Sequence, residues 1–353
     1  MTPGVGRDAA SAPRSADVAR LAGVSRKTVS RVLNNEPYVS DEARSRVLAA
    51  AEELGYRLNH AARALASGRN RSLGVVALGT AGYGTASLLV HIEQAVRDAG
   101  YALRVINTPD GDPEGIAGAL ESLLEQGVDG VVVSEPVVTG EVPLRVDVPV
   151  LFLGAPPSFA AARTLTVSVG ARALARTATE HLLDLGHTTV HHLAGPRQWY
   201  ATKDRIEGWQ AALAARGAHE PPLLGGDWSA ASGYAAGRAL AADTSVTAVF
   251  AAGDEMAIGL IHALRESGRR VPEDVSVVGF DGNPVFAYVS PPLTTVRQPF
   301  EAAAREGIRL LVHAIEQPDA DLPQAGDPPV ELVLRGSTAP PPSHRGRPLS
   351  RTT

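Results

Sequence analysis

The chain has 353 residues and a formal net charge of −5, with 44% hydrophobic and 20% charged residues. This length and composition allow two or three compact units with their own cores, and they exclude a chain that is disordered throughout. The chain has no cysteine, which excludes disulfides, thiolate metal sites and cysteine catalysis. No apolar run approaches the length of a membrane span, and the N-terminal MTPGVGRDAASAPRS has no apolar core. We therefore expect no membrane partner and a cytoplasmic location.

The net charge is unevenly distributed along the chain. Residues 1–72 contain twelve Lys and Arg against seven Asp and Glu, so this part carries a formal charge of +5 and the remainder −10. A basic front on an acidic body would steer and orient the protein on a polyanion.

After a flexible leader over residues 1–14, the segment 17–34, DVARLAGVSRKTVSRVLN, predicts two short helices around a tight turn. Gly23 supplies the permissive backbone of the turn, and Ser25 stands where a helix N-cap is needed. A third helix is expected from about Asp41 to Leu54, with Ser40 as its N-cap and Gly55 at its end. These helices predict a small all-α domain over residues 15–57, with an apolar core formed by Val18, Ala22, Val24, Val29, Val32, Val47, Ala51 and Leu54.

The outer face of the second helix is polar and cationic. Such donors suit phosphates and base edges in a major groove. The alternative is an ordinary helical hairpin whose charged face is only solvated. The residues on this face are Arg26, Lys27, Thr28, Ser30 and Arg31.

The next residues continue as NNEPYVSDEARSRVLAAAEELGYRLNHAARALASGR. Together with the preceding segment they resemble the N-terminal domain of the lactose repressor family of bacterial transcription regulators. The resemblance extends through GDWSAASGY, DEMAIG, VPEDVSVVGFD and PPLTTVRQPF. It implies a helix-turn-helix that binds operator DNA, in which Arg26 and Lys27 contact bases and Arg31 contacts a base or a phosphate. The DNA-binding residues that it implies are Ser25, Arg26, Lys27, Thr28, Ser30, Arg31, Asn34, Asn59 and Leu65.

The segment 58–69, LNHAARALASGR, is too short to be a stable helix alone in water. One interpretation is a plain interdomain linker. The resemblance implies a hinge helix that forms on DNA, packs against its dimer mate and inserts Leu65 into the minor groove. Leu58 stands where the family usually has Pro, so entry into this helix is expected to be looser.

Residues 70–338 show alternating strand and helix patterns. Val-rich strands such as SLGVVAL, GVVVS and VSVVGF are separated by helices such as LLVHIEQAVRDAG. This alternation predicts parallel, doubly wound α/β sheets with ligand chemistry at the strand carboxyl ends. The length favours two sheets, and the resemblance implies two lobes, as in periplasmic sugar-binding proteins, with crossings near Val169, Val296 and Pro329. The resulting bounds are about 72–168 and 297–328 for the N-lobe, and about 169–296 and 329–338 for the C-lobe.

The tail, residues 339–353, is rich in Pro, Arg and Ser and lacks a core pattern, so we expect it to be disordered. It contains no leucine heptad of the kind that joins some family members into tetramers. A homodimer is therefore the simpler expectation.

Other chemistries have weaker support in the sequence. The glycine-rich GTAGYG at 79–84 lacks the spacing of a dinucleotide-binding loop, which leaves a cleft-lining loop as the better interpretation and predicts no cofactor. His187, His191 and His192 lie at strand-like spacing, which does not converge on a metal. We find no ordered triad, HExxH or Walker loop, so no enzyme is expected.

A ligand cleft between the lobes is better supported. Arg205 can fork to two hydroxyls, Trp228 can stack on the apolar face of a sugar, and Asp281 can accept from hydroxyls at a strand end. Each matches a ligand-contacting position of the family. Gly253 and Gly154 replace polar groups common in the family, which either removes hydroxyl recognition or makes room for a larger ligand. The full set of expected effector-binding residues is Arg205, Trp228, Asp281, Tyr83, Trp199, Asp254, Gln298 and Phe300.

The sequence thus predicts a dimeric repressor that leaves a palindromic operator when a small sugar-like effector binds in the cleft. One alternative is a sugar-binding protein of the periplasmic type without a DNA role. Another is a nucleotide-dependent α/β enzyme. Corepression instead of induction also stays open, because no motif gives the sign of the coupling.

Overall fold

The computed structural model describes residues 13–33, 37–56, 70–78, 82–108, 113–134, 145–154, 159–326 and 328–342. The chain divides into two compact units, residues 1–70 and residues 71–353. Asn34, Asn59, Leu65, the rest of segment 58–69 and most of the tail lie outside the described residues.

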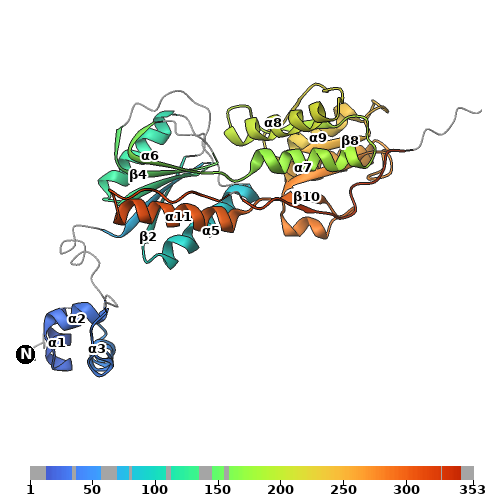
Figure 1. The fold of residues 1–353 in the computed structure, drawn as a ribbon. Helices are drawn as coiled ribbons and strands as arrows, with labels where there is room; N and C mark the ends of the chain where they lie inside the picture. The colour runs from blue at the N-terminus through green and yellow to red at the C-terminus, as the bar shows by residue number, and fades with distance from the viewer. Residues whose placement is uncertain are drawn as a thin grey trace, which may run out of the picture. The chain divides into compact units, whose positions relative to one another are not determined.

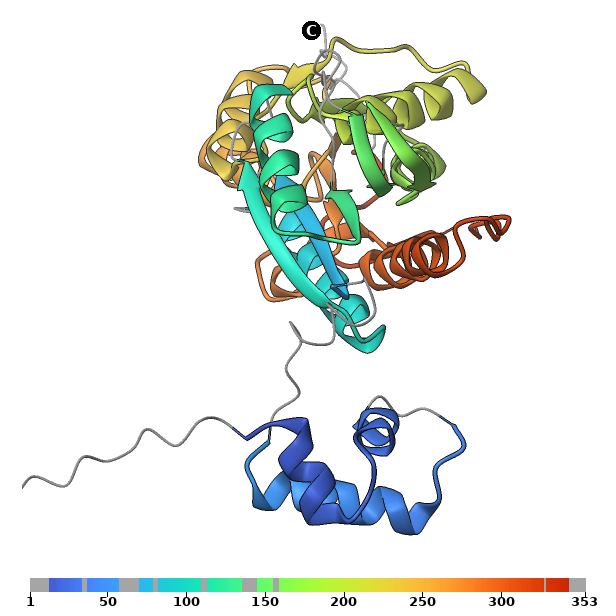
Figure 2. The ribbon, with the colours of Figure 1, turned by 90° about the vertical axis from the view of Figure 1, so that its left-hand side faces the viewer.

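The first unit consists of the helices α1 (Ser15–Ala22), α2 (Arg26–Leu33) and α3 (Asp41–Glu53), drawn in blue in Figure 2. Gly23 ends α1 in the left-handed conformation, with φ 64°, as the turn requires. The N–H of Val24 donates to the carbonyl of Ala19, which closes the turn. The predicted turn residue is therefore confirmed.

Hydroxyl groups begin the next two helices. The backbone N–H of Thr28 donates to Ser25 Oγ at 3.1 Å, and the N–H of Ala43 donates to Ser40 Oγ at 3.3 Å. Each bond satisfies one of the donors that a helix leaves unpaired at its N-terminus. Both predicted caps are confirmed.

The core of this unit is small and aliphatic. Most of the predicted core residues are buried, while Val24 and Leu54 are partly buried at its edge. A core of small aliphatic side chains, with Tyr56 packed partly buried against it, gives limited stability, as expected for a domain of this size. The buried residues are Val18, Ala19, Ala22, Val29, Val32, Val47, Ala50 and Ala51.

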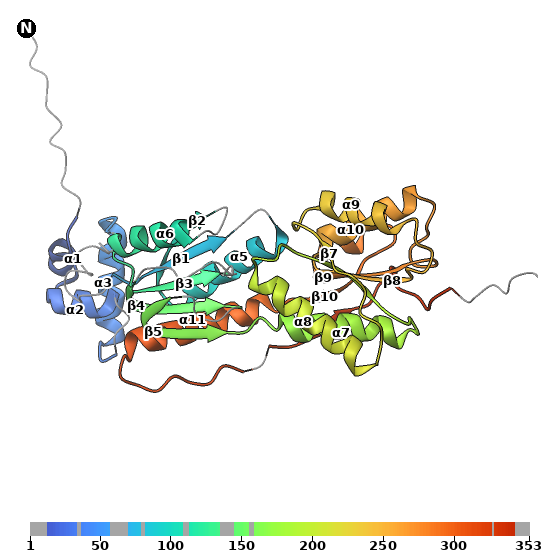
Figure 3. The same cartoon turned by 90° about the horizontal axis from the view of Figure 1, so that it is seen from above.

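The second unit contains two α/β lobes, each built on its own sheet (Figure 1). The N-lobe sheet has the strand order β2-β1-β3-β4-β5, and all its pairs are parallel (Figure 3). Its strands are rich in Val and Leu, and helices cover both faces. The strands are β1 (Ser72–Leu78), β2 (Ala102–Thr108), β3 (Gly130–Ser134), β4 (Arg145–Leu153) and β5 (Ala160–Val167), and the helices are α5 (Tyr83–Asp98), α6 (Pro113–Glu125) and α11 (Phe300–Glu316).

The C-lobe sheet has the order β11-β10-β9-β8-β6-β7. Helices α7 and α8 pack on one face, and α9 and α10 on the other. The strands are β6 (His191–Ala194), β7 (Leu224–Gly225), β8 (Ala248–Ala251), β9 (Ser276–Asp281), β10 (Thr294–Arg297) and β11 (Glu331–Val333). The helices are α7 (Ala171–Asp184), α8 (Tyr200–Ala215), α9 (Ala230–Leu240), α10 (Asp254–Glu266) and the 3₁₀ turn η1 (Pro284–Ala287).

The fold class predicted from the sequence is confirmed, with two differences in the sheets. The first difference is the edge strand β5, with the sequence AAARTLTV. It has few large apolar residues, so the sequence pattern does not predict a strand there. Strand β11 pairs antiparallel with β10, so the C-lobe sheet is not wholly parallel. An edge strand needs only one partner, and its direction is not fixed by a helical crossover.

The chain changes lobe in three segments of the described residues. It leaves the N-lobe sheet after β5 and enters the C-lobe at α7. It returns between β10 and α11, and it goes back between α11 and β11. The two short passages bring the carboxyl ends of β5 and β10 to the junction of the lobes. Among the residues that the structure describes, none of the helices is long and apolar enough to cross a membrane.

Candidate DNA-binding helix and effector cleft

Helix α2 presents two cations at its N-terminus. Arg26 and Lys27 are both exposed, and the first turn contains no acidic residue. Because the N-terminus of a helix is already electropositive, two cations there are unfavourable for the isolated helix. The same arrangement joins backbone N–H donors to cationic side chains, and this combination attracts phosphates.

The other polar residues of this helix have more mixed surroundings. Ser25 Oγ and Thr28 Oγ1 lie 2.9 Å apart and share a hydrogen bond, so both hydroxyls help to fix the start of α2. Ser30 is exposed, while Thr28 and Arg31 are half-buried. Of the predicted DNA-binding residues that the structure describes, the exposed ones are thus Ser25, Arg26, Lys27 and Ser30.

A cavity of about 310 Å³ lies between the two lobes of the second unit. The N-lobe contributes the start of α5, and the C-lobe contributes the carboxyl ends of β6 and β9 with the loops that follow. The lobes approach closely here, since a Cβ placed on Gly84 would lie 3.4 Å from Asp281 Oδ1. The lining residues are Gly82, Tyr83, Gly84, Thr85, Pro196, Trp199, Ala201, Arg205, Asp227, Trp228, Gly253, Glu255 and Asp281.

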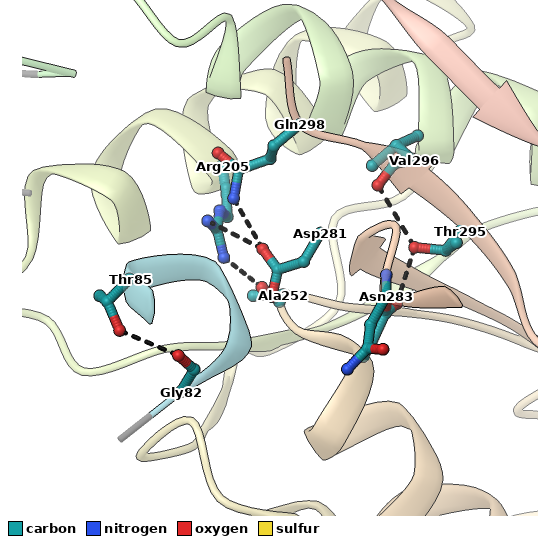
Figure 4. Close-up of polar contacts among 10 residues, drawn as sticks. Gly82, Thr85, Arg205, Ala252, Asp281, Asn283, Thr295, Val296 and Gln298 are labelled. Atoms are coloured by element: carbon teal, nitrogen blue, oxygen red, sulfur yellow. Dashed lines mark hydrogen bonds and ion pairs between the residues drawn. The ribbon is translucent and has the colours of Figure 1, made fainter. Parts of the chain in front are cut away.

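Asp281 is the central carboxylate of this cavity (Figure 4). It is 8% exposed, its Oδ1 accepts a hydrogen bond from Gln298 Nε2 at 2.7 Å, and it lies 3.8 Å from Arg205 Nη2. Burial raises the pKa of Asp281 to about 6, although Arg205 and Gln298 favour the charged form. Its φ of 109° is unusual for a residue with a side chain. Such strain is typical of functional sites.

The guanidinium of Arg205 is held in place on several sides. Its Cζ lies 3.9 Å from the ring centroid of Phe280 and 5.0 Å from that of Trp228. Its Nη1 donates to the carbonyl of Ala252 (Figure 4). A planar cation fixed between aromatic rings keeps a constant orientation, which suits recognition of a ligand with several hydroxyls.

Two tryptophans form an angled aromatic wall. The rings of Trp199 and Trp228 are 6.1 Å apart and nearly perpendicular, at 84°. Trp228 has a φ of 73°, and its ring lies so close to Gly195 that a Cβ there would approach it to 2.1 Å. Trp199 precedes α8 in the C-lobe but packs against the core of the N-lobe, so it connects the two sides of the cavity.

The structure places the remaining predicted effector residues differently. Tyr83 lines the cavity, whereas Gln298 reaches it only through its hydrogen bond to Asp281. Phe300 is buried in the N-lobe core and packs edge-on against Tyr83 at 6.4 Å. Gln298 and Phe300 also line a neighbouring cavity that shares Tyr83 and Asp281 with the first one, so their role as effector-binding residues stays a prediction.

Asp254 does not line the cavity. It is fully buried, and its two oxygens accept hydrogen bonds from Thr295 Oγ1 at 2.7 Å and from the N–H of Asn283 at 2.8 Å. Burial, together with the negative charge of Asp281, raises its pKa well above the ordinary value. Asp254 thus holds the loop after β9 in place, and its neighbour Glu255 faces the cavity instead.

Several cavity residues were not predicted from the sequence. Asp227 and Glu255 are each adjacent to a predicted residue, but the sequence does not show which of two neighbouring side chains faces the cavity. Thr85 lies at the start of α5, where its Oγ1 donates to the carbonyl of Gly82 at 3.1 Å (Figure 4). Residues 82–85 have the sequence G-Y-G-T, with glycine and a hydroxyl at a helix start. This pattern could have indicated that the start of α5 lines the cavity.

The two glycines that depart from the family pattern have different physical roles. Gly154 has a φ of 79°, and a Cβ there would approach Val169 to 3.2 Å. Its backbone conformation therefore favours glycine, and it does not line the cavity. Gly253 lines the cavity in an extended conformation, φ −159°, which any residue can adopt.

Two of the three histidines considered as metal ligands have hydrogen-bond partners, whereas His191 Nδ1 is buried without one among the described residues. The ring of His187 bonds to Thr247 Oγ1 and to the carbonyl of Ala339, and His192 is buried with Nδ1 bonded to the carbonyl of Phe250. Burial lowers the pKa of His192 to about 4, so it is neutral near pH 7. In the part of the chain that the structure describes, no group of three or more metal-binding side chains converges.

Comparison with known proteins gives consistent matches over both units. Residues 16–59 match the family described as bacterial regulatory proteins, lacI family, and residues 179–338 match a periplasmic binding protein-like domain. The chain is 36% identical to the HTH-type transcriptional regulator CelR of Thermobifida fusca, covering 90% of this chain and 94% of the relative. It is 32% identical to the ribose operon repressor of Escherichia coli, covering 91% and 98%.

Solved structures agree with these matches. The Lac repressor dimer bound to operator and an anti-inducer is similar with a TM-score of 0.74 and 30% identity, covering 92% of this chain and 98% of that chain. A complex of the regulator CelR with cellobiose is similar with a TM-score of 0.66 and 32% identity, covering 92% and 99%.

A helix-turn-helix unit followed by a two-lobed ligand-binding unit defines a ligand-responsive, DNA-binding transcription regulator. The chain belongs to the LacI family of bacterial regulatory proteins.

Proposed function

We propose that the protein is a homodimeric transcriptional repressor that binds a palindromic operator and leaves it when a sugar occupies the interlobe cleft. The observation that carries the DNA-binding part is the exposed pair Arg26 and Lys27 at the start of α2. A dimer gives two copies of this helix, which matches the two-fold symmetry of a palindromic site.

Within each half-site, Arg26 and Lys27 contact base edges, and Arg31 contacts a base or a phosphate. Ser25, Thr28 and Ser30 position the helix on the backbone, since hydroxyls at a helix start bind phosphate oxygens. Asn34, Asn59 and Leu65 belong to the same proposal on the family resemblance alone, with Leu65 as the wedge in the minor groove.

The effector part rests on the cavity. An aromatic wall, a fixed guanidinium and a buried carboxylate are the groups that recognise the apolar face and the hydroxyls of a sugar. Related structures contain such ligands: one is the CelR–cellobiose complex, and another is a LacI-family regulator of Enterococcus faecium with bound ribose, 26% identical with a TM-score of 0.63.

The cavity has walls from both lobes, so a ligand that contacts both favours one lobe arrangement over the other. This difference in affinity is the only means by which the sugar changes operator binding. We place the lobe bounds near Val169, Val296 and Pro329, with a hinge segment over residues 58–69. The protein acts without catalysis and in the cytoplasm, where its operator is.

Selection from random-sequence duplexes, followed by binding measurements at several salt concentrations, tests the DNA-binding proposal. We expect a two-fold symmetric site and an affinity that falls steeply with salt. Arg26→Ala and Lys27→Ala should each weaken the selected site by about 1–3 kcal/mol. Arg145→Ala, at an exposed cation of the N-lobe sheet, is the matched control. Unchanged affinity in both helix variants would refute α2 as the recognition helix.

A further inference from the structure

We propose that the absence of a side chain at Gly253 sets the size of the effector, and that the cleft takes an uncharged saccharide of at least two rings. This inference rests on the proposed function, since it names the substrate class of the same cleft.

The fold does not require glycine at position 253. Gly253 has an extended backbone, φ −159° and ψ 148°. A Cβ there would lie 3.7 Å from Met256, 3.8 Å from Trp228 and 4.0 Å from Asp281, all ordinary contact distances. The position is also the N-cap of α10, where a Ser or Asn side chain would bind a free N–H of the helix. Helix capping alone would therefore favour a side chain.

Other glycines nearby have clear structural causes. At Gly195 and Gly279 a Cβ would approach the ring of Trp228 to 2.1 Å and Asp254 Oδ1 to 2.2 Å. Gly253 shows no such conflict. The lack of a side chain at Gly253 leaves open volume in the cavity, between the ring of Trp228 and the carboxylate of Asp281.

The size and shape of the cavity favour a ligand with two sugar rings. The cavity of about 310 Å³ lies at the lower end of the range for small-molecule clefts, and this volume leaves room for a second sugar ring. Its two indoles, Trp199 and Trp228, stand at 84° to each other. A single sugar ring can stack its apolar face on only one of these perpendicular indoles, whereas two rings joined by a bent glycosidic bond can stack on one each.

The charged residues that line the cavity favour an uncharged ligand. Asp227, Glu255 and Asp281 face the cavity, and Arg205 is the one cation among its described lining residues. Arg205 already lies against Asp281 and the carbonyl of Ala252. The remaining carboxylates repel anions, so phosphorylated sugars and uronic acids are excluded.

Calorimetry with a library of neutral monosaccharides, neutral disaccharides and sugar phosphates tests this proposal on the full chain. For the wild type we expect a disaccharide to bind most tightly and the sugar phosphates not to bind. Gly253→Asn should weaken that disaccharide at least about tenfold, and Gly253→Ser less, while weak monosaccharide binding persists. Because both substitutions can cap α10, the melting temperature should be unchanged or higher. Weaker binding at an unchanged or higher melting temperature would show that the new side chain fills the cavity and does not destabilise the protein.

Gly225→Ala is the matched control, because a Cβ there would meet nothing within 4 Å and the residue does not line the cavity. It should bind like the wild type. A monosaccharide or a sugar phosphate as the tightest ligand would overturn the inference, as would full disaccharide affinity in Gly253→Asn. These results would leave the proposed function standing. If no sugar of any class binds, the effector part of the proposed function fails, and the inference fails with it.

Discussion

Asp281 makes effector binding depend on pH. Its pKa is raised to about 6 because burial disfavours the charged form. A sugar hydroxyl that donates to this carboxylate favours its ionised form, so ligand binding lowers the pKa. By linkage, affinity is at its full value above the ligand-free pKa and is lost as pH falls through it. At about one pH unit below, about one tenth of the protein is ionised at Asp281, and Kd rises about tenfold.

Calorimetric titration with the best-binding sugar between about pH 5 and pH 8 measures this effect. Asp281→Asn keeps the size of the side chain but removes the charge. We expect it to lose about 1.5–3 kcal/mol of binding free energy at neutral pH and to show no pH dependence in this window. Asp243→Asn is the control, because hydrogen bonds from Ser245 lower the pKa of Asp243, so it is ionised throughout this range, and it does not line the cavity. Its titrations should follow the wild-type profile. A wild-type affinity that does not change with pH, or an unchanged profile in Asp281→Asn, would exclude Asp281 as the group whose ionisation controls effector binding.

Three further substitutions test the local structure. Gly195→Ala should displace the ring of Trp228, which a Cβ would approach to 2.1 Å, and calorimetry should show effector affinity reduced at least about tenfold. Gly23→Ala puts a side chain at φ 64°, so it should destabilise the helix-turn-helix unit by about 1–2 kcal/mol, measured by hydrogen exchange. Thr295→Val removes the hydroxyl donor to the buried Asp254 and should lower the free energy of unfolding by about 1–3 kcal/mol in a denaturant titration.

The local features of the first unit could be predicted well from the sequence. A turn glycine with positive φ and two hydroxyl caps act over three or four residues, so a single stretch of sequence contains both partners. Gly23, Ser25 and Ser40 have the predicted roles. The alternating pattern likewise gave the strand-rich lobes, because buried parallel strands need runs of apolar residues.

The cleft could be predicted only in part. Arg205, Trp228 and Asp281 were expected from the family resemblance, and they do line one cavity. Asp254 and Glu255 are adjacent in the sequence, and which of them faces the ligand depends on Thr295 and on the backbone of residue 283, far along the chain. Such long-range hydrogen bonds leave no local signal.

The two departures from the family show the same limit. Gly154 and Gly253 look equivalent in the sequence, and both could signal a lost hydroxyl partner. In the structure a positive φ accounts for Gly154, whereas only the cavity accounts for Gly253. Backbone conformation decides between the two interpretations, and a single sequence does not contain it.

In the proposed mechanism, one ligand in the interlobe cleft controls a DNA-binding helix in another unit. Fluorescence anisotropy of a labelled, selected operator, measured at fixed salt while the best-binding sugar is titrated, tests this coupling most directly. We expect operator affinity to fall as the cleft fills, and we expect Asp281→Asn to shift this response to higher sugar concentration without changing operator affinity in the absence of sugar. Operator affinity that stays constant or rises while calorimetry shows the sugar bound would contradict this mechanism.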